Sequence, residues 1–200
     1  HDTVPNSVGA CDNASGVAIL LQLADLLSKR KNERTMRLIS FGAEEQLSVG
    51  ATSYAARNIG VDGEIALEVN LDGVGAGIGV NEVSVIGGVG LRDYVESELA
   101  DCGYSAEVKS DVSPFSDHYP FSAKGIPSVW FRGRRPNFFF HSRLDDLDHI
   151  IVEDVAETAQ AVAHLISSVD SAAVMPFSRE IPPEQWSKIE HYKRELYGLP

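Results

Sequence analysis

The stretch Ser40-Phe-Gly-Ala-Glu-Glu-Gln46 is expected to join the end of a strand to the start of a helix. The preceding run, Thr35-Met-Arg-Leu-Ile39, is β-branched and apolar, which predicts a buried strand over residues 35–41. A helix is expected over residues 48–58. Glu44 and Glu45 then follow the carboxyl end of a strand, where open α/β sheets bind ligands. Neighbouring side chains of an extended segment point to opposite sides, so the two carboxylates can do different jobs.

Outward from this stretch, strands and helices alternate along the chain. Strands are expected over residues 35–41, 65–71, 82–86, 106–109 and 126–131, and helices over residues 13–30, 48–58, 91–102, 152–169 and 182–197. This alternation with short loops predicts a three-layer α/β/α fold with a mostly parallel mixed sheet and helices on both faces. The composition turns polar after Pro176, which predicts a main domain over residues 1–175 and a C-terminal helical extension over residues 176–200.

The bulk composition excludes several classes of protein. A chain of 200 residues with 44% hydrophobic content suits one domain with a sizeable core. The net charge of −12 and the scattered Lys and Arg residues argue against nucleic acid and anionic membranes as partners. We expect no apolar run of membrane-spanning length. Two cysteines, Cys11 and Cys102, do not make a disulfide scaffold, and a single bridge between them stays open.

Acids and histidines recur where strands are expected to end. Because the loops after neighbouring strands converge on one edge of such a sheet, side chains from four loops are expected to meet there: Asp12, Glu45, Asp72 and His141. An oxygen-rich set that contains an imidazole suits Zn²⁺, Mn²⁺ or Co²⁺. So many carboxylates in one place repel one another unless cations lie among them. The competing interpretation is that these acids are ordinary solvated loop residues.

Several sequence blocks match a known family in the same order and at compatible spacing. They are Asp2–Pro5, Gly9–Ala18, Phe41–Gln46, Asn70–Gly75, Ser116–Phe121, Gly125–Val129, and Phe140-His141 followed by Asp145. On these blocks the chain resembles the co-catalytic di-zinc aminopeptidases, which include bacterial leucyl aminopeptidases and, more distantly, glutamate carboxypeptidase and glutaminyl cyclase. The resemblance covers residues 2 to about 150 and makes residues 1–175 the catalytic domain. It implies a hydrolase that removes N-terminal residues from peptides, and it favours an extracellular or periplasmic location.

The resemblance also implies roles for individual residues. Asp12 matches the ligand that bridges two zinc ions, Glu45 and His141 match the other ligands of one zinc, and Asp72 matches a ligand of the second. Glu44 matches the general base that deprotonates a zinc-bound water. Asp2 matches a carboxylate that orients a ligand histidine, and Asp145 is a candidate to orient His141.

Two departures from the family pattern bear on activity. The family's His-x-Asp places a ligand histidine one residue before His1, so His1 itself is not expected to bind metal. We therefore expect a chain whose N-terminal part is missing and that holds one zinc or none, although two belong to the full domain. The second departure is Phe140, which stands where many relatives carry a tyrosine. Phe139 and Phe140 are predicted to line an apolar substrate pocket, with core packing as the alternative, and His118 is predicted to lie near the substrate.

Two other functions remain open for this chain. One is a glutaminyl cyclase-like reaction, which uses one zinc with a similar acid pair and histidine. The other is a metal-poor, inactive binding module on the same fold, as in the transferrin receptor. The intact set of Glu44, Glu45, Asp72 and His141 favours an enzyme.

Overall fold

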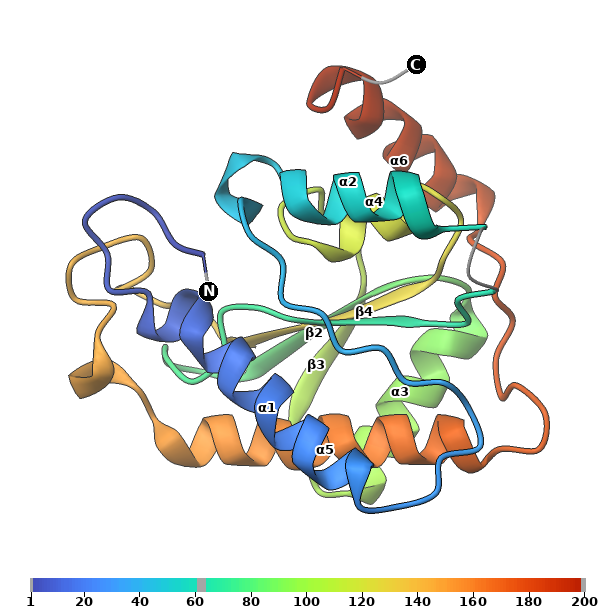
Figure 1. Cartoon of the computed structure of the whole chain (residues 1–200), viewed down its shortest axis with the longest axis horizontal. Helices are drawn as coiled ribbons and strands as arrows, with labels where there is room; N and C mark the ends of the chain where they lie inside the picture. The colour runs from blue at the N-terminus through green and yellow to red at the C-terminus, as the bar shows by residue number, and fades with distance from the viewer. Residues whose placement is uncertain (1, 61–63, 199–200) are drawn as a thin grey trace.

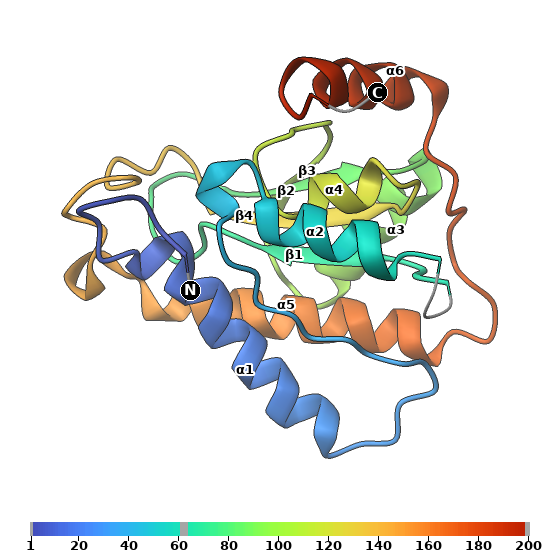
Figure 2. The ribbon, with the colours of Figure 1, turned by 45° about the horizontal axis from the view of Figure 1, so that its top comes forward.

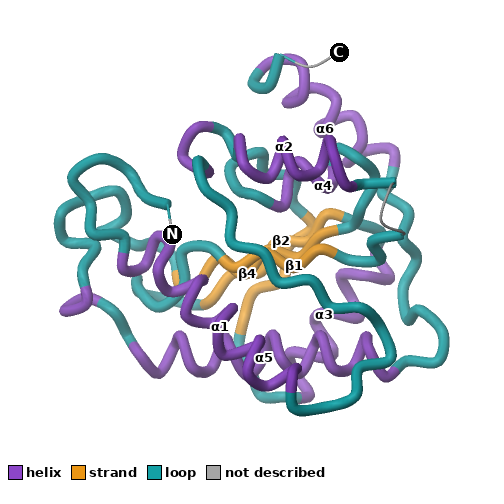
Figure 3. The backbone as a smooth tube through the Cα atoms, in the orientation of Figure 1, coloured by secondary structure: helices purple, strands orange, loops and turns teal. Residues whose placement is uncertain are grey.

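The computed structural model describes residues 2–60 and 64–198, and a four-stranded sheet forms the centre of this part of the chain. The strand order is β1-β4-β2-β3, with bounds Glu68–Leu71 for β1, Asn81–Ile86 for β2, Ala106–Ser110 for β3 and Ser128–Arg134 for β4. Figure 3 shows the strands in orange at the centre of the molecule. The β1–β4 and β2–β3 pairs are parallel, whereas β2 and β4 are antiparallel. The expected mixed, mostly parallel sheet is therefore confirmed.

Helices cover both faces of this sheet, as predicted (Figures 1 and 2). One layer contains α1 (Ser15–Ser28), α3 (Val89–Asp101) and α5 (Val152–Ser171), and the other contains α2 (Val49–Asn58), α4 (His118–Ser122) and α6 (Pro183–Glu195). The main core lies between the sheet and the first layer, and it includes Ile19, Val83, Phe131 and Leu165. The three-layer α/β/α architecture follows from burying apolar side chains on both faces of one sheet.

The apolar character of α1 corrects one expectation from the sequence. Residues Ala10–Ser28 are long and apolar enough, by length and composition alone, to cross a membrane. In the fold, however, Ile19, Leu23 and Leu27 of this helix are almost fully buried in the main core. Core helices of globular proteins pass the same test, so packing accounts for the hydropathy of α1.

The predicted strand over residues 35–41 is wrong. This segment is irregular, and among the described residues no strand forms a ladder with it. Figure 1 shows it as a light-blue loop that passes the sheet. Met36 packs partly against the core, but Leu38 is 38% exposed. A β-branched run forms a strand only when a neighbouring strand supplies hydrogen bonds, and among the described residues no strand pairs with this run, although Met36 and Phe41 are packed.

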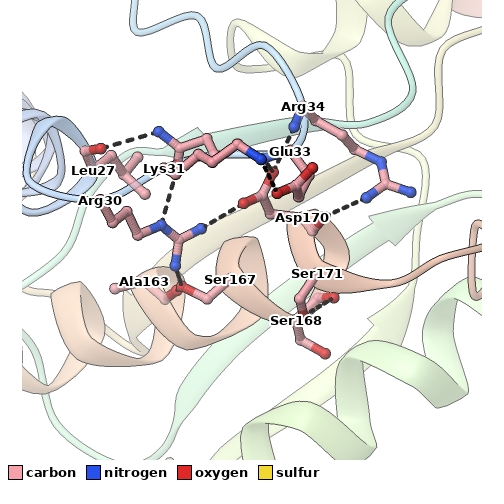
Figure 4. A network of polar contacts seen from close by, with 11 residues as sticks. Leu27, Arg30, Lys31, Glu33, Arg34, Ala163, Ser167, Ser168, Asp170 and Ser171 are labelled. Atoms are coloured by element: carbon pink, nitrogen blue, oxygen red, sulfur yellow. Dashed lines mark hydrogen bonds and ion pairs between the residues drawn. The ribbon is translucent and has the colours of Figure 1, made fainter.

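A buried carboxylate joins the segment after α1 to the last turn of α5 (Figure 4). Asp170 is 3% exposed, and its Oδ2 accepts a hydrogen bond from Arg30 Nη2 at 2.9 Å. Its Oδ1 accepts from the backbone N–H groups of Glu33 at 3.1 Å and Arg34 at 2.8 Å. The guanidinium of Arg34 donates to the backbone carbonyls of Asp170 and Ala172. This network fixes the connection between two helices that are far apart in the sequence.

Candidate metal centre

The acids and the histidine singled out in the sequence lie at one end of the sheet. Asp12 lies in the kinked turn before α1, Glu44 and Glu45 form the turn before α2, Asp72 directly follows β1, and His141 lies in the loop after β4. Because β1 and β4 are parallel neighbours, their carboxyl ends deliver Asp72 and His141 to the same edge.

Three of these side chains form a compact group. His141 Nε2 lies 3.1 Å from Asp12 Oδ2 and 3.2 Å from Glu45 Oε2, and one ligand atom from each residue lies within 4.8 Å of the other two. Glu45 Oε1 is buried and has no hydrogen-bond partner in the described part of the chain. Two carboxylates and an imidazole with a free buried oxygen suit a divalent cation such as zinc.

Asp72 lies beside this group and is not one of its three members. Its carboxylate contacts that of Asp12, and its Oδ2 accepts a hydrogen bond of 2.5 Å from Ser116 Oγ. Asn70 Nδ2 in turn donates to Ser116 Oγ at 2.6 Å. Asp72 is therefore held in a fixed position next to Asp12.

The electrostatics of the acids also point to a cation. Burial, followed by the charges of Asp72 and Glu45, raises the pKa of Asp12 to about 9. Burial, followed by the charges of Asp72 and Asp117, raises the pKa of Glu44 to about 9. Carboxylates packed this closely retain protons unless positive charge is placed among them, and a divalent cation supplies that charge.

Glu44 and Glu45 point to different partners, but for another reason than the one predicted. They lie on a short 3-10 turn, Glu44–Gln46, and not on an extended segment. The backbone before and after this turn is left-handed, with φ of 59° at Ala43, 60° at Leu47 and 50° at Ser48. Glu45 consequently faces His141, whereas Glu44 lines a cleft that Asp12, Asp72 and Asp117 also line.

Two acids with predicted orienting roles contact backbone groups, and their orienting roles stay predictions. Asp145, predicted to orient His141, accepts from the backbone N–H of Cys11 at 2.6 Å and of Asp12 at 3.1 Å. Asp2, predicted to orient a ligand histidine, accepts from the backbone N–H of Glu45 at 3.3 Å. Both fix the backbone of a candidate ligand. The prediction for His1 lies outside the described residues.

The phenylalanines predicted to line a substrate pocket lie next to the candidate centre. Phe140 is 38% exposed and stacks on His141 with ring centroids 3.7 Å apart, and the Arg135 guanidinium lies 5.5 Å from the Phe140 ring. Phe139 packs against His149 at 4.1 Å. Neither ring lines the cleft beside Glu44, so their contact with a substrate stays a prediction.

His118, which was predicted to lie near the substrate, has a packing role in the structure. His118 is fully buried in α4, and its ring packs on Trp130 with centroids 4.8 Å apart. Neither ring nitrogen forms a hydrogen bond of good geometry within the described chain. The residue is part of the packing between α4 and the sheet. The Ser-Asp-His block does contribute to the site, but through Ser116 and Asp117.

Burial of His118 predicts a loss of stability in acid. Burial, followed by the charge of Arg132, lowers its pKa to about 3, whereas an unfolded histidine has a pKa of about 6.5. Below pH 6.5 the unfolded state binds a proton that the folded state does not, so the free energy of unfolding falls by about 1.4 kcal/mol per pH unit from this residue. Between pH 7 and pH 5, urea titrations should show the wild type losing about 2 kcal/mol more than His118→Phe. The exposed-site variant His191→Ala should behave like the wild type. An equal loss in His118→Phe would contradict the prediction.

Comparisons with known proteins agree with this geometry. The model of peptidase family M28 matches residues 1–166. Aminopeptidase YwaD of Bacillus subtilis is 28% identical over 173 residues, which cover 81% of this chain and 38% of that protein. A probable zinc metalloprotease of Pyrenophora tritici-repentis is 39% identical over 67 residues, which cover 34% of this chain and 15% of that protein.

Solved structures show the same fold. A zinc aminopeptidase from Bacillus subtilis superposes with a TM-score of 0.74 at 24% identity, over 90% of this chain and 47% of that one. An aminopeptidase from Aneurinibacillus sp. strain AM-1 superposes with a TM-score of 0.71 at 27% identity, over 86% of this chain and 43% of that one. The chain thus spans less than half the length of each of these relatives.

Proposed function

This chain belongs to peptidase family M28, and from that membership we propose that it carries the metal-binding centre of a zinc aminopeptidase that removes N-terminal residues from peptides. The observation that supports this most directly is the convergence of Asp12, Glu45 and His141 from three separate loops to within 4.8 Å. The names of the Bacillus relatives, a zinc aminopeptidase among them, point to the same reaction class.

In this proposal each residue of the centre has one task. Asp12, Glu45 and His141 would hold one zinc, and Asp72 would hold a second, with Asp12 between them. Zinc in these positions supplies Lewis-acid polarisation of the scissile carbonyl and lowers the pKa of a water. Asp145 fixes the backbone at Asp12 by accepting hydrogen bonds from the N–H groups of Cys11 and Asp12. Asp2 fixes the backbone at Glu45 in the same way, by accepting from the Glu45 N–H.

Glu44 performs the proton transfers. It lines the cleft next to the metal group without belonging to it, so its carboxylate can accept a proton from the attacking water and later donate it to the leaving amine. The proposed reaction therefore depends on Glu44 for proton transfer and on Glu45 for metal binding, although the two are neighbours in the sequence. Phe139 and Phe140, of which Phe140 stacks on His141, suit an apolar side chain of the substrate. An extracellular or periplasmic location stays a prediction from the resemblance.

Zinc binding should be measurable as stabilisation. A ligand that binds only the folded state at 100 times its Kd adds about 2.7 kcal/mol. For a chain of 150–250 residues that corresponds to a rise in Tm of roughly 5–10 °C. We expect this shift in the metal-stripped wild type on addition of zinc, and its loss in His141→Ala, measured by differential scanning calorimetry.

The control for this experiment is His191→Ala, which removes an exposed histidine on α6 and should keep the full zinc shift. Equal zinc shifts in His141→Ala and the wild type would contradict the proposed centre. Release of leucine from Leu-p-nitroanilide, abolished by a chelator and restored by zinc, tests the reaction itself.

A further inference from the structure

The C-terminal extension is docked against the layer of helices that includes α4. Figure 2 shows α6 lying over α2 and α4, and the family match ends at residue 166, well before this helix begins. Ile189 is fully buried, and its backbone carbonyl accepts a hydrogen bond of 2.6 Å from Tyr119 Oη. Gln185 Oε1 accepts a buried hydrogen bond of 2.8 Å from Gly87 N–H. These contacts fix both the beginning and the middle of α6.

The residues after α6 turn back toward the candidate metal centre. Tyr197 Oη donates to the backbone carbonyl of Pro114 at 2.8 Å, and the Tyr197 ring stacks on Tyr119 with centroids 5.0 Å apart. Burial raises the pKa of Tyr197, and the charges of Glu44 and Asp117 raise it further. Through Pro114, Tyr197 therefore holds the segment that leads into Ser116 and Asp117.

Tyr197 holds the loop of residues 113–117, and this loop contacts the acids of the site. Two residues after Pro114, Ser116 Oγ donates to Asp72 Oδ2, and the next residue, Asp117, lines the cleft with Glu44. The buried hydroxyl of Ser48 lies against both Asp117 and Tyr197. The loop is thus held by Tyr197 at Pro114 and contacts Asp72 through Ser116.

We propose that Tyr197 is a positioning residue of the candidate centre: its hydroxyl holds Pro114, so that Ser116 stays on Asp72 and Asp117 stays beside Glu44. This inference rests on the proposed function, because it assigns importance to the placement of Asp72 and Glu44. It makes the extension, which lies beyond the family match, a working part of the site.

The test compares two tyrosines of the same extension. Tyr197→Phe removes the hydroxyl and keeps the ring, whereas Tyr192→Phe removes a hydroxyl from α6 whose ring also contacts Tyr119, at 6.5 Å. With zinc-loaded protein and Leu-p-nitroanilide, Tyr197→Phe should lower kcat about tenfold and leave KM within about twofold, by analogy with losses of outer contacts at metal sites. Tyr192→Phe should change neither value by more than about twofold. Unchanged kcat in Tyr197→Phe would overturn the proposal, as would an equal loss in both variants.

A second readout does not depend on hydrolysis. Because Ser116 holds Asp72, Tyr197→Phe should weaken zinc binding about fivefold in competition titrations with a chelating dye. Tyr192→Phe should match the wild type, and equal zinc affinity in all three proteins would refute the positioning role. If the wild type bound zinc but hydrolysed no peptide, the proposed function would fail, and the zinc affinities would still decide the role of Tyr197.

Discussion

Replacement of Glu44 by glutamine is expected to lower kcat for peptide hydrolysis by about a thousandfold and to leave the zinc content unchanged. General acid–base catalysis contributes about 10²–10⁴ to rates, and Glu44 is proposed to move the proton in two successive steps. A thousandfold loss corresponds to about 4 kcal/mol of transition-state stabilisation. Glutamine keeps the size of the side chain and its place on the Glu44–Gln46 turn, so the cleft should keep its shape.

Glu44 and Glu45 should respond differently to the same substitution. Glu45→Gln removes a charged oxygen from the group formed with Asp12 and His141, so the loss of activity should come with a loss of zinc. Glu153→Gln, an exposed position in the first turn of α5, serves as the neutral control. Kinetics and elemental analysis of the purified variants measure both effects. If Glu44→Gln kept more than about a tenth of the activity, Glu44 would not be the general base.

Replacement of Asp170 by alanine is expected to lower the free energy of unfolding by about 3 kcal/mol. Removing one partner of a buried ion pair leaves the other charge without compensation, which typically costs 3–5 kcal/mol. The Asp170 carboxylate also accepts from two backbone N–H groups, those of Glu33 and Arg34, and these would lose their partner. The Arg30 side chain is 34% exposed and can turn toward water, so we place the loss at the lower end of that range.

An exposed ion pair in the same part of the molecule provides the control. Asp25 and Lys29 form an i,i+4 pair on α1 with an N–O distance of 2.5 Å, and both side chains are more than 60% exposed. Asp25→Ala should therefore change the free energy of unfolding by about 0.5 kcal/mol at most. Urea titrations of the two variants measure the difference. A loss below about 1 kcal/mol in Asp170→Ala would show that burial gives this network no special importance.

Helices were easier to predict from the sequence than strands. The helix expected over residues 152–169 corresponds to α5, Val152–Ser171, because its apolar spacing alone specifies which face is buried. The run over residues 35–41 has a strand-like composition but no strand, since pairing depends on neighbours distant in the sequence. Of the strand expected over residues 65–71, only Glu68–Leu71 forms a strand, because only these residues pair with β4.

The candidate ligands were predictable because each stands in a short block with a recognisable order. Their supporting contacts were not. Asp145 binds the backbone N–H of Cys11 across 134 positions of sequence, and no local pattern relates the two. His118 has the side chain of a functional residue, and only the tertiary structure shows that it packs on Trp130. The sequence shows which side chains could bind a metal or transfer a proton, whereas only the structure shows which of them are accessible to do so.

The left-handed residues around the Glu44–Gln46 turn limit how this molecule can be engineered. A left-handed conformation costs a residue with a side chain about 1–2 kcal/mol, and glycine avoids that cost. In a laboratory selection for heat resistance alone, glycine should accumulate at Ala43 and Leu47, which sequencing of the surviving clones would show. Those variants would have a higher Tm and a lower kcat, because a more flexible Glu44–Gln46 turn no longer fixes the position of the Glu44 carboxylate. Selection for both properties together would retain the side chains.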